Sequence, residues 1–169
     1  RLLPEKGIRE FVNAAMQIKH TYPQVRFLLL GGLDDNPSAI PEREISGWVE
    51  EKLLEWPGHV SMKPWLERTS VFVLPSYYRE GVPRSIQEAM AMGRPIITAN
   101  VPGCRETVVD GENGLLVVPR DVTTLVIAMQ HFIENPARIR EMGRKSRQIA
   151  EQKFDVRRIN NQMISAMEL

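Results

Sequence analysis

Short runs of consecutive apolar residues recur along the chain, and each is typical of a strand with both faces covered. The clearest are "VRFLLLG" (Val25 to Gly31), "VFVLPS" (Val71 to Ser76), "PIITAN" (Pro95 to Asn100) and "GLLVV" (Gly114 to Val118). A weaker candidate is "HVSMK", His59 to Lys63. Because apolar and polar residues do not alternate in these runs, they favour parallel strands between two layers of helices.

Between the runs, apolar residues return every three or four positions, which is the spacing of an amphipathic helix. The helical patterns comprise Ile8, Phe11, Val12, Ala15 and Ile18, then Ile45, Trp48, Val49 and Leu53, then Leu125, Ile127, Ala128, Phe132 and Ile133. Alternating strands and helices predict one α/β domain built on a doubly wound parallel sheet, as in a Rossmann-like fold. From about residue 137, two charged helical stretches are expected to form a C-terminal tail.

Composition narrows the function classes. The 169 residues are 43% hydrophobic and 25% charged, as expected for one globular domain. The net charge of +1 argues against nucleic acid as the main partner. Cys104 is the single cysteine, so an internal disulfide is excluded. The opening "RLLPEKG" has no initiator Met, which suggests a piece of a longer protein.

No metal site is expected from the pattern of metal-binding residue types. The three histidines, His20, His59 and His131, are widely separated in the sequence. Asp34 and Asp35 are adjacent and therefore lack the Asp-x-Asp spacing of metal-dependent transferases.

Two carboxylates stand out in "REGVPRSIQEAMAMG", Arg79 to Gly93, which follows a predicted strand. Glu80 lies in a glycine-proline turn, and Glu88 lies inside a helix predicted from about Pro83. In such folds, ligands bind beyond the carboxyl ends of the strands. The free N–H groups of a helix N-terminus there would suit a phosphate. Glu88 would lie roughly 7.5 Å further along the helix axis, an offset that fits a nucleotide.

On spacing alone, both carboxylates also suit solvated surface charges. The small and apolar residues around Glu88, and the glycine beside Glu80, favour a binding role instead. Other turns in the chain are predicted to be structural. They are the Asn113–Gly114 turn and the turn from Gly103 to Glu106.

Longer stretches of the sequence resemble a known family. "EGVPRSIQE", followed by "AMAMGRPIITANVPGCRETVVDGENGLLV", resembles the signature of retaining glycosyltransferases of the GT-B fold, family 4. That signature has two glutamates separated by seven residues, as Glu80 and Glu88 are. "RLLPEKGI" resembles the start of the family's nucleotide-binding domain. The resemblance runs from Arg1 to about Phe154, and it implies the C-terminal half of a GT-B fold without its N-terminal acceptor domain.

The resemblance also implies roles for single residues. Glu80 would be catalytic and contact the transferred sugar, and Glu88 would bind the ribose of the nucleotide. The other implied donor-binding residues are Arg1 and Lys6 for the diphosphate, and the backbone N–H groups around Gly81, Val82 and Ser85. Possible nucleotide contacts are Gly31, Gly32 and Pro64, although a simple turn explains the two glycines equally well. Neither a cofactor nor a metal is implied.

The sequence of the motif is most similar to that of enzymes that extend polyprenyl-diphosphate-linked sugars. The resemblance therefore implies transfer of a hexose or N-acetylhexosamine from a UDP-linked donor to a glycan or polyprenyl-linked acceptor in surface polysaccharide synthesis. The full enzyme would then be cytoplasmic and peripheral to the inner membrane. Two alternatives stay open: a sugar-nucleotide epimerase of the GT-B fold, and a non-catalytic nucleotide-binding or docking module. A dinucleotide-dependent dehydrogenase is disfavoured, because "GGLDDNP" lacks Gly-x-Gly-x-x-Gly.

Overall fold

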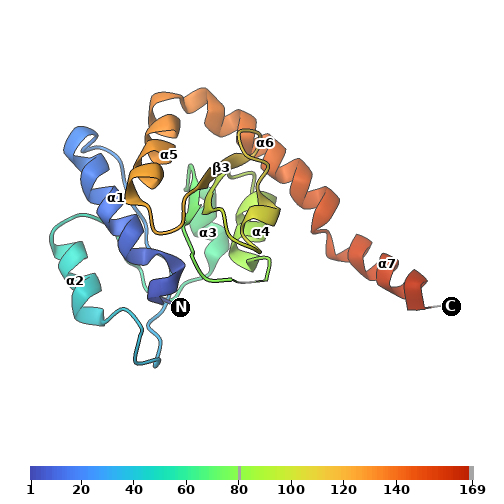
Figure 1. Cartoon of the computed structure of the whole chain (residues 1–169), viewed down its shortest axis with the longest axis horizontal. Helices are drawn as coiled ribbons and strands as arrows, with labels where there is room; N and C mark the ends of the chain where they lie inside the picture. Colours follow the sequence, from blue (N-terminus) through green and yellow to red (C-terminus); the bar gives the residue numbers. More distant parts are fainter. Residues whose placement is uncertain (80, 168–169) are drawn as a thin grey trace.

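Three parallel strands form the central sheet of the computed structural model, which describes residues 1–79 and 81–167 (Figure 1). The strands are β1 (Phe72–Leu74), β2 (Ile96–Ala99) and β3 (Gly114–Val117), and they lie side by side in that order. Phe72 pairs with Ile96, and Ile96 pairs with Gly114 on its other side. The predicted parallel sheet is confirmed by these strands.

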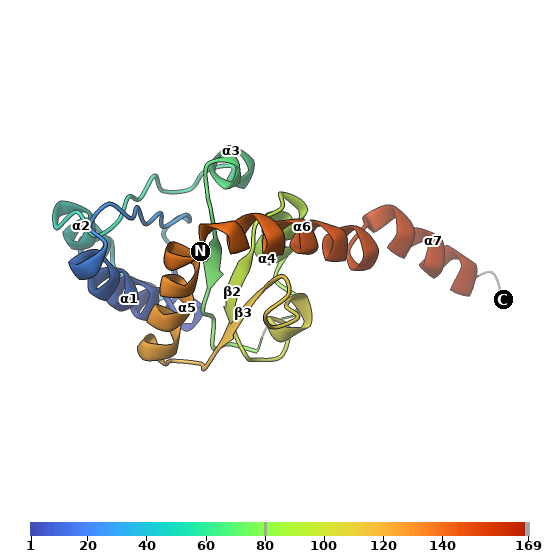
Figure 2. The same ribbon diagram turned by 90° about the horizontal axis from the view of Figure 1, so that it is seen from above.

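Helices cover both faces of the sheet. Figure 2 shows α1 (Ile8–Thr21) and α5 (Val122–Glu134) on one side, and α4 (Arg84–Ala91) and α6 (Pro136–Lys153) on the other. The helices within each pair contact each other. This arrangement confirms the predicted doubly wound α/β fold. The two shorter helices are α2 (Glu42–Glu50) and α3 (Met62–Glu67).

The core follows the helical spacing seen in the sequence. On α1, the side chains of Ile8, Val12, Ala15 and Ile18 are all buried. All four residues of β2 are buried too, since this strand has a neighbour on each edge and a helical layer on each face.

The C-terminal helices differ in how they pack. On α6, the close contact with α4 and its loop depends on Gly143, where an added Cβ would lie 2.2 Å from the carbonyl oxygen of Gly93. The last helix, α7 (Val156–Met167), has no buried residue and extends away from the rest (Figure 1). No helix in the described ranges is long and apolar enough to cross a bilayer.

Two strand predictions differ from the structure. The segment 25–31 is extended but is not part of the three-stranded sheet, and among the described residues its one bridge joins Leu28 to Glu55. The His59–Lys63 strand prediction was wrong, because a helix begins at Met62, directly after Ser61 at the N-cap. A segment of only five residues with some apolar side chains does not show whether it forms a strand or the first turn of a helix.

Both turns predicted to be structural are confirmed as such. Asn113 is fully buried, accepts a hydrogen bond from the Val109 N–H at 2.7 Å, and donates one to the Thr107 carbonyl at 3.0 Å. In the other turn, the carboxylate of Glu106 accepts a hydrogen bond from the Gly103 N–H. Both side chains satisfy backbone groups of their own turns.

Candidate functional site

The carboxyl end of β1 is closed by the N-terminal segment of the chain. A short 3₁₀ helix, η1 (Pro4–Lys6), places the carbonyl oxygen of Glu5 at 3.0 Å from both the Ser76 hydroxyl and the Tyr77 N–H, which donate to it. The next residue, Gly7, has φ +76°, and a Cβ there would lie 2.3 Å from the carbonyl oxygen of Pro75. Only glycine permits this approach, which fixes Lys6 beside the end of β1.

The two cations implied to bind a diphosphate both line one end of a cavity of about 810 Å³, which runs along residues 25–31 and β1. Lys6 is half-buried there. Arg1 is 74% exposed at its side chain and forms an ion pair with Asp34, with 3.5 Å between Nε and Oδ2. Asp34 therefore orients the Arg1 guanidinium, a role that the polar loop containing Asp34 was not expected to have.

The N-terminus of α4 provides unpaired backbone donors. Pro83 lies at the N-cap rather than at the predicted first helical position, and it has no side-chain group to cap the helix. Its carbonyl accepts from the N–H groups of Ile86 at 3.1 Å and Gln87 at 3.2 Å. Within the described ranges, the N–H groups of Arg84 and Ser85 have no acceptor. This end of α4 therefore suits an anion.

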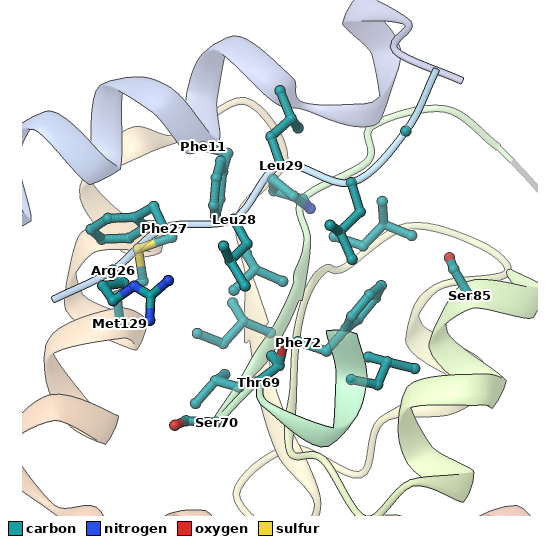
Figure 3. A pocket seen from close by; sticks show the side chains of 18 of the residues that line it. Phe11, Arg26, Phe27, Leu28, Leu29, Thr69, Ser70, Phe72, Ser85 and Met129 are labelled. Atoms are coloured by element: carbon teal, nitrogen blue, oxygen red, sulfur yellow. The ribbon is translucent and has the colours of Figure 1, made fainter. Parts of the chain in front are cut away.

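Ser85 and Glu88 lie one turn apart on α4, as the predicted stripe requires. Ser85 is half-buried and lines the cavity from the first turn of the helix (Figure 3). Glu88 is exposed, and its carboxylate makes no hydrogen bond or ion pair with any described residue. A carboxylate in this position can accept hydrogen bonds from a diol.

The loop before α4 is open. Gly81 and Val82 are exposed, and an added Cβ at Gly81 would meet nothing within 4 Å. The space beside this backbone is therefore free for a ligand. Glu80, the predicted catalytic residue, lies outside the residues that the structure describes.

The glycine pair is approached by the protein's own side chains. An added Cβ would lie 2.9 Å from the Leu2 side chain at Gly31, and 3.1 Å from the His59 side chain at Gly32. The carbonyl of Gly32 also accepts a hydrogen bond from the Leu2 N–H at 3.1 Å. These contacts explain the glycines structurally and hold Arg1 at the sheet edge.

Pro64 is not among the residues that line the cavity, although Met62 and Leu66 of the same helix are. It sits exposed in the first turn of α3. Its suggested role relied on a preceding strand, and residues 59–63 do not form one.

A third cation, which was not predicted from the sequence, lies beside the loop that follows β1. Arg120 follows β3 and has φ +61°, and its guanidinium carbon lies 4.2 Å from the centre of the Tyr77 ring. This cation–π contact joins the loops after β1 and β3. Its position in the sequence could have indicated this place, because Arg120 lies between a predicted strand and Asp121. Asp121 caps α5 by accepting a hydrogen bond from the Thr123 N–H at 2.8 Å.

The electrostatics of the site come from cations and a helix end. The carboxylates with a clearly shifted pKa among residues 1–79 and 81–167 lie away from these cations: a hydrogen bond from Arg9 lowers the pKa of Glu44, and one from Arg26 lowers the pKa of Glu55. Among the described residues, no group of three or more His, Cys, Asp or Glu side chains could hold a metal ion. The arrangement suits an anionic ligand with a polar, hydroxyl-bearing end.

Comparison with known proteins adds independent findings. The profile of the family described as glycosyl transferases group 1 matches residues 1–135. Among curated proteins, the chain is 29% identical over 156 residues to a glycogen synthase of Mycobacterium tuberculosis, covering 92% of this chain and 37% of that protein. It is 30% identical over 135 residues to N,N'-diacetylbacillosaminyl-diphospho-undecaprenol alpha-1,3-N-acetylgalactosaminyltransferase of Campylobacter jejuni, covering 80% of this chain and 34% of that protein.

Solved structures agree on the fold. The structure of Anabaena Alr3699/HepE in complex with UDP matches with a TM-score of 0.88 at 28% identity, covering 99% of this chain and 46% of that one. The chain thus spans less than half the length of each of these similar proteins.

Proposed function

We propose that this chain, which belongs to the family of glycosyl transferases, group 1, binds the nucleotide-sugar donor in a retaining glycosyltransferase of the GT-B fold. The reaction would move a hexose or N-acetylhexosamine to a glycan or lipid-linked acceptor. The acceptor would bind an N-terminal domain that these residues do not include. No metal would be needed at the donor site.

One observation carries this proposal: the uncapped N-terminus of α4 faces the same edge as Lys6, with Glu88 one turn further along the helix. A diphosphate at the free N–H groups would be stabilised by the helix dipole and by the ammonium of Lys6. Glu88 would then accept hydrogen bonds from the ribose hydroxyls. An offset of about one helical turn, roughly 5 Å, suits the step from a phosphate to the ribose next to it.

The same groups would assist bond cleavage. As the bond between the sugar and the diphosphate breaks, negative charge grows on the departing phosphate oxygen. Fixed N–H donors and cations stabilise that charge more than they stabilise the intact donor. Lys6 and Arg1 are the charged candidates, and the backbone of Gly81, Val82 and Ser85 would supply donors to the diphosphate and sugar. For Glu80, we propose contact with the hydroxyls of the transferred sugar.

The similar proteins support the finer parts of the proposal. HepE was solved with UDP, which favours a uridine nucleotide here. The Campylobacter jejuni transferase is named for an undecaprenol-linked acceptor, which favours a polyprenyl-linked acceptor and a place in surface polysaccharide synthesis such as lipopolysaccharide. Such an acceptor would keep the full enzyme in the cytoplasm, peripheral to the inner membrane.

Calorimetric titration of this chain with UDP and GDP, with and without EDTA, tests the function. We expect binding of at least one of them, unchanged by EDTA. Loss of binding in EDTA would contradict the metal-free site. Binding of NAD, with no binding of a nucleoside diphosphate, would instead indicate a dinucleotide enzyme. Binding of none of these ligands would leave a docking module as the better account.

Membrane association can be tested separately by liposome flotation. Arg138 and Arg147 on α6 are engaged in ion pairs with Glu141 and Glu151. We therefore expect little flotation of this chain with anionic vesicles, since the lipid-linked acceptor is proposed to bind the N-terminal domain. Strong flotation would assign a membrane surface to α6 instead.

A further inference from the structure

Arg120 has a backbone conformation that arginine seldom adopts. The Asp121 N–H donates to the Val118 carbonyl at 3.2 Å, so residues 118–121 form a hydrogen-bonded turn. Pro119 is the second residue of this turn, and Arg120, with φ +61°, is the third. These are the features of a type II turn, whose third residue is normally glycine because its φ is positive. An arginine at this position therefore carries a backbone strain that glycine would not have.

The turn that carries Arg120 is fixed to the helix that follows it. Asp121 accepts hydrogen bonds at the N-terminus of α5, from the N–H groups of Thr123 at 2.8 Å and Thr124 at 3.2 Å. The Thr124 hydroxyl donates to the Asp121 carbonyl and accepts from the Val118 N–H, both at 3.2 Å. The residues on both sides of Arg120 are therefore tied to α5, which gives the Arg120 side chain a rigid base.

The guanidinium of Arg120 contacts the first residue of a more open loop, the one between β1 and α4. Its guanidinium carbon lies 4.2 Å from the centre of the Tyr77 ring, and the Tyr77 N–H donates to the Glu5 carbonyl at 3.0 Å. The next two residues, Tyr78 and Arg79, are exposed, and their N–H groups donate to no described residue. Tyr77 is therefore where this loop is anchored as it leaves β1, by one side-chain contact and one backbone hydrogen bond.

The same loop carries backbone donors of the proposed donor site. Gly81 and Val82 are exposed, and their N–H groups donate to no described residue. The Val82 carbonyl accepts a hydrogen bond from the Gln87 side chain on α4 at 3.1 Å, which anchors the far end of the loop. The direction of the free N–H groups therefore depends on the anchors at Val82 and Tyr77.

We propose that Arg120 is a positioning residue for the donor: through Tyr77, it holds the loop between β1 and α4 so that the N–H groups of Gly81 and Val82 meet the ligand. This inference rests on the proposed function, because it concerns how the same site is ordered. A loop that is ordered before binding loses less conformational entropy when the ligand binds. The affinity for the donor nucleotide should therefore depend on Arg120, although Arg120 itself does not touch the nucleotide.

Stability alone does not account for arginine at this position. A cation–π contact between exposed side chains stabilises a protein by an amount similar to the cost of one positive φ. The contact between Arg120 and Tyr77 thus offsets the strain in the turn without a clear net gain in the free energy of unfolding. The orientation of the loop that Tyr77 begins is the property that glycine at position 120 would not supply.

Glycine substitutions at two positions with positive φ test the proposal. Arg120→Gly removes the guanidinium and the strain together, and it should fold because glycine is the usual residue at this position of the turn. Lys52→Gly is the matched control. Among the described residues, Lys52 is the other non-glycine residue with positive φ, at +57°, and it is an exposed cation that does not line the cavity of about 810 Å³. Each variant loses one positive charge and one strained φ.

We expect Arg120→Gly to bind UDP or GDP about two- to fivefold more weakly in calorimetric titration, which is the effect of one exposed cation–π contact on an equilibrium constant. Lys52→Gly should bind as the unsubstituted chain does. Amide hydrogen exchange at Tyr77, measured without ligand, should become faster by about the same factor in Arg120→Gly and stay unchanged in Lys52→Gly. Thr98 in β2 is the internal reference for exchange.

Variants of Tyr77 separate positioning from a direct contact between Arg120 and the nucleotide. Tyr77→Leu removes the aromatic ring and should weaken binding about as much as Arg120→Gly does. The double variant should lose no more than either single variant, since both remove the same contact. Tyr77→Phe keeps the ring and should lose less than Tyr77→Leu. Losses that add in the double variant would mean that Arg120 acts on the ligand directly, which would overturn the proposal.

Equal affinity of Arg120→Gly and the unsubstituted chain for the nucleotide would also overturn it. If the unsubstituted chain binds neither UDP nor GDP, the proposed function fails, and exchange at Tyr77 still decides the inference. Unchanged exchange in Arg120→Gly would then overturn the inference, and faster exchange would support the ordering of the loop by Arg120.

Discussion

β1 and β2 look alike in the sequence yet differ in burial. Both are short apolar runs, "FVL" and "IITA", and they pair with each other in parallel. Every residue of β2 is buried, whereas every residue of β1 is only half-buried. β2 has a strand on each edge, whereas β1 has β2 on one edge and lines the cavity of about 810 Å³. A continuous apolar run therefore predicts that both faces of a strand are covered. It does not predict whether another strand pairs with each of its edges.

The difference in burial between β1 and β2 should affect the free energy of unfolding most when core side chains are truncated. Ile96→Ala in β2 should lower the free energy of unfolding by about 2–5 kcal/mol, because it leaves a cavity in a fully packed region. Val73→Ala in β1 should lower it by about 1 kcal/mol or less, since the side chain already borders open space. Urea denaturation measures both, and equal losses would contradict the comparison.

The glycine at the end of β1 provides the next test. Gly7→Ala should destabilise the protein by more than about 2 kcal/mol, because it adds a clash with Pro75 to an unfavourable positive φ. Gly58 is the matched control, with φ +78° and nothing within 4 Å of an added Cβ. Gly58→Ala should therefore cost only the backbone term, about 1–2 kcal/mol. If thermal or urea unfolding gives the same loss for both, the contact with Pro75 is unimportant.

A surface ion pair should have the smallest effect. Arg9 donates to both carboxylate oxygens of Glu44, at 2.7 and 2.9 Å, and this hydrogen bonding lowers the pKa of Glu44. Its stabilisation is present above the ordinary pKa of a glutamate and is lost as the pH falls through the lowered pKa of the folded state. Both side chains are partly exposed, so Glu44→Gln should cost less than about 1 kcal/mol at neutral pH.

The pH dependence is checked by urea denaturation of wild type and Glu44→Gln between neutral and acidic pH. The two curves should converge at low pH, where Glu44 is protonated. A gap that persists unchanged in acid would mean that the substitution acts through packing rather than charge.

The sequence predicted the layers of the fold better than its strand pairings. β1, β2, β3 and the helices α1 and α5 follow from apolar runs and helical spacing, because burial of faces is a local property of the pattern. Pairing of the segment 25–31 could not be read in this way, since it depends on which strand occupies the neighbouring edge. The prediction for residues 59–63 failed because a five-residue segment carries too little periodicity.

The candidate site was predicted in part. Ser85 and Glu88 lie on α4 as the spacing required, since positions three apart share a helix face. Lys6 reaches the sheet edge through Gly7, whose close approach to Pro75 is a tertiary contact that local spacing does not reveal. The ion pair between Arg1 and Asp34, and the contact between Arg120 and Tyr77, also depend on tertiary structure.

The central claim is that a nucleoside diphosphate lies across the N-terminus of α4 with its ribose at Glu88. Calorimetric titration of UDP into Glu88→Ala tests it most directly, with Glu112→Ala as the control. Glu112 is exposed in the turn before β3, so it lies at the opposite edge of the sheet. Circular dichroism first confirms that both variants fold. We predict that Glu88→Ala weakens binding by about 1.5–3 kcal/mol and that Glu112→Ala leaves it unchanged. Equal affinity of Glu88→Ala and the unsubstituted chain for UDP would contradict the account.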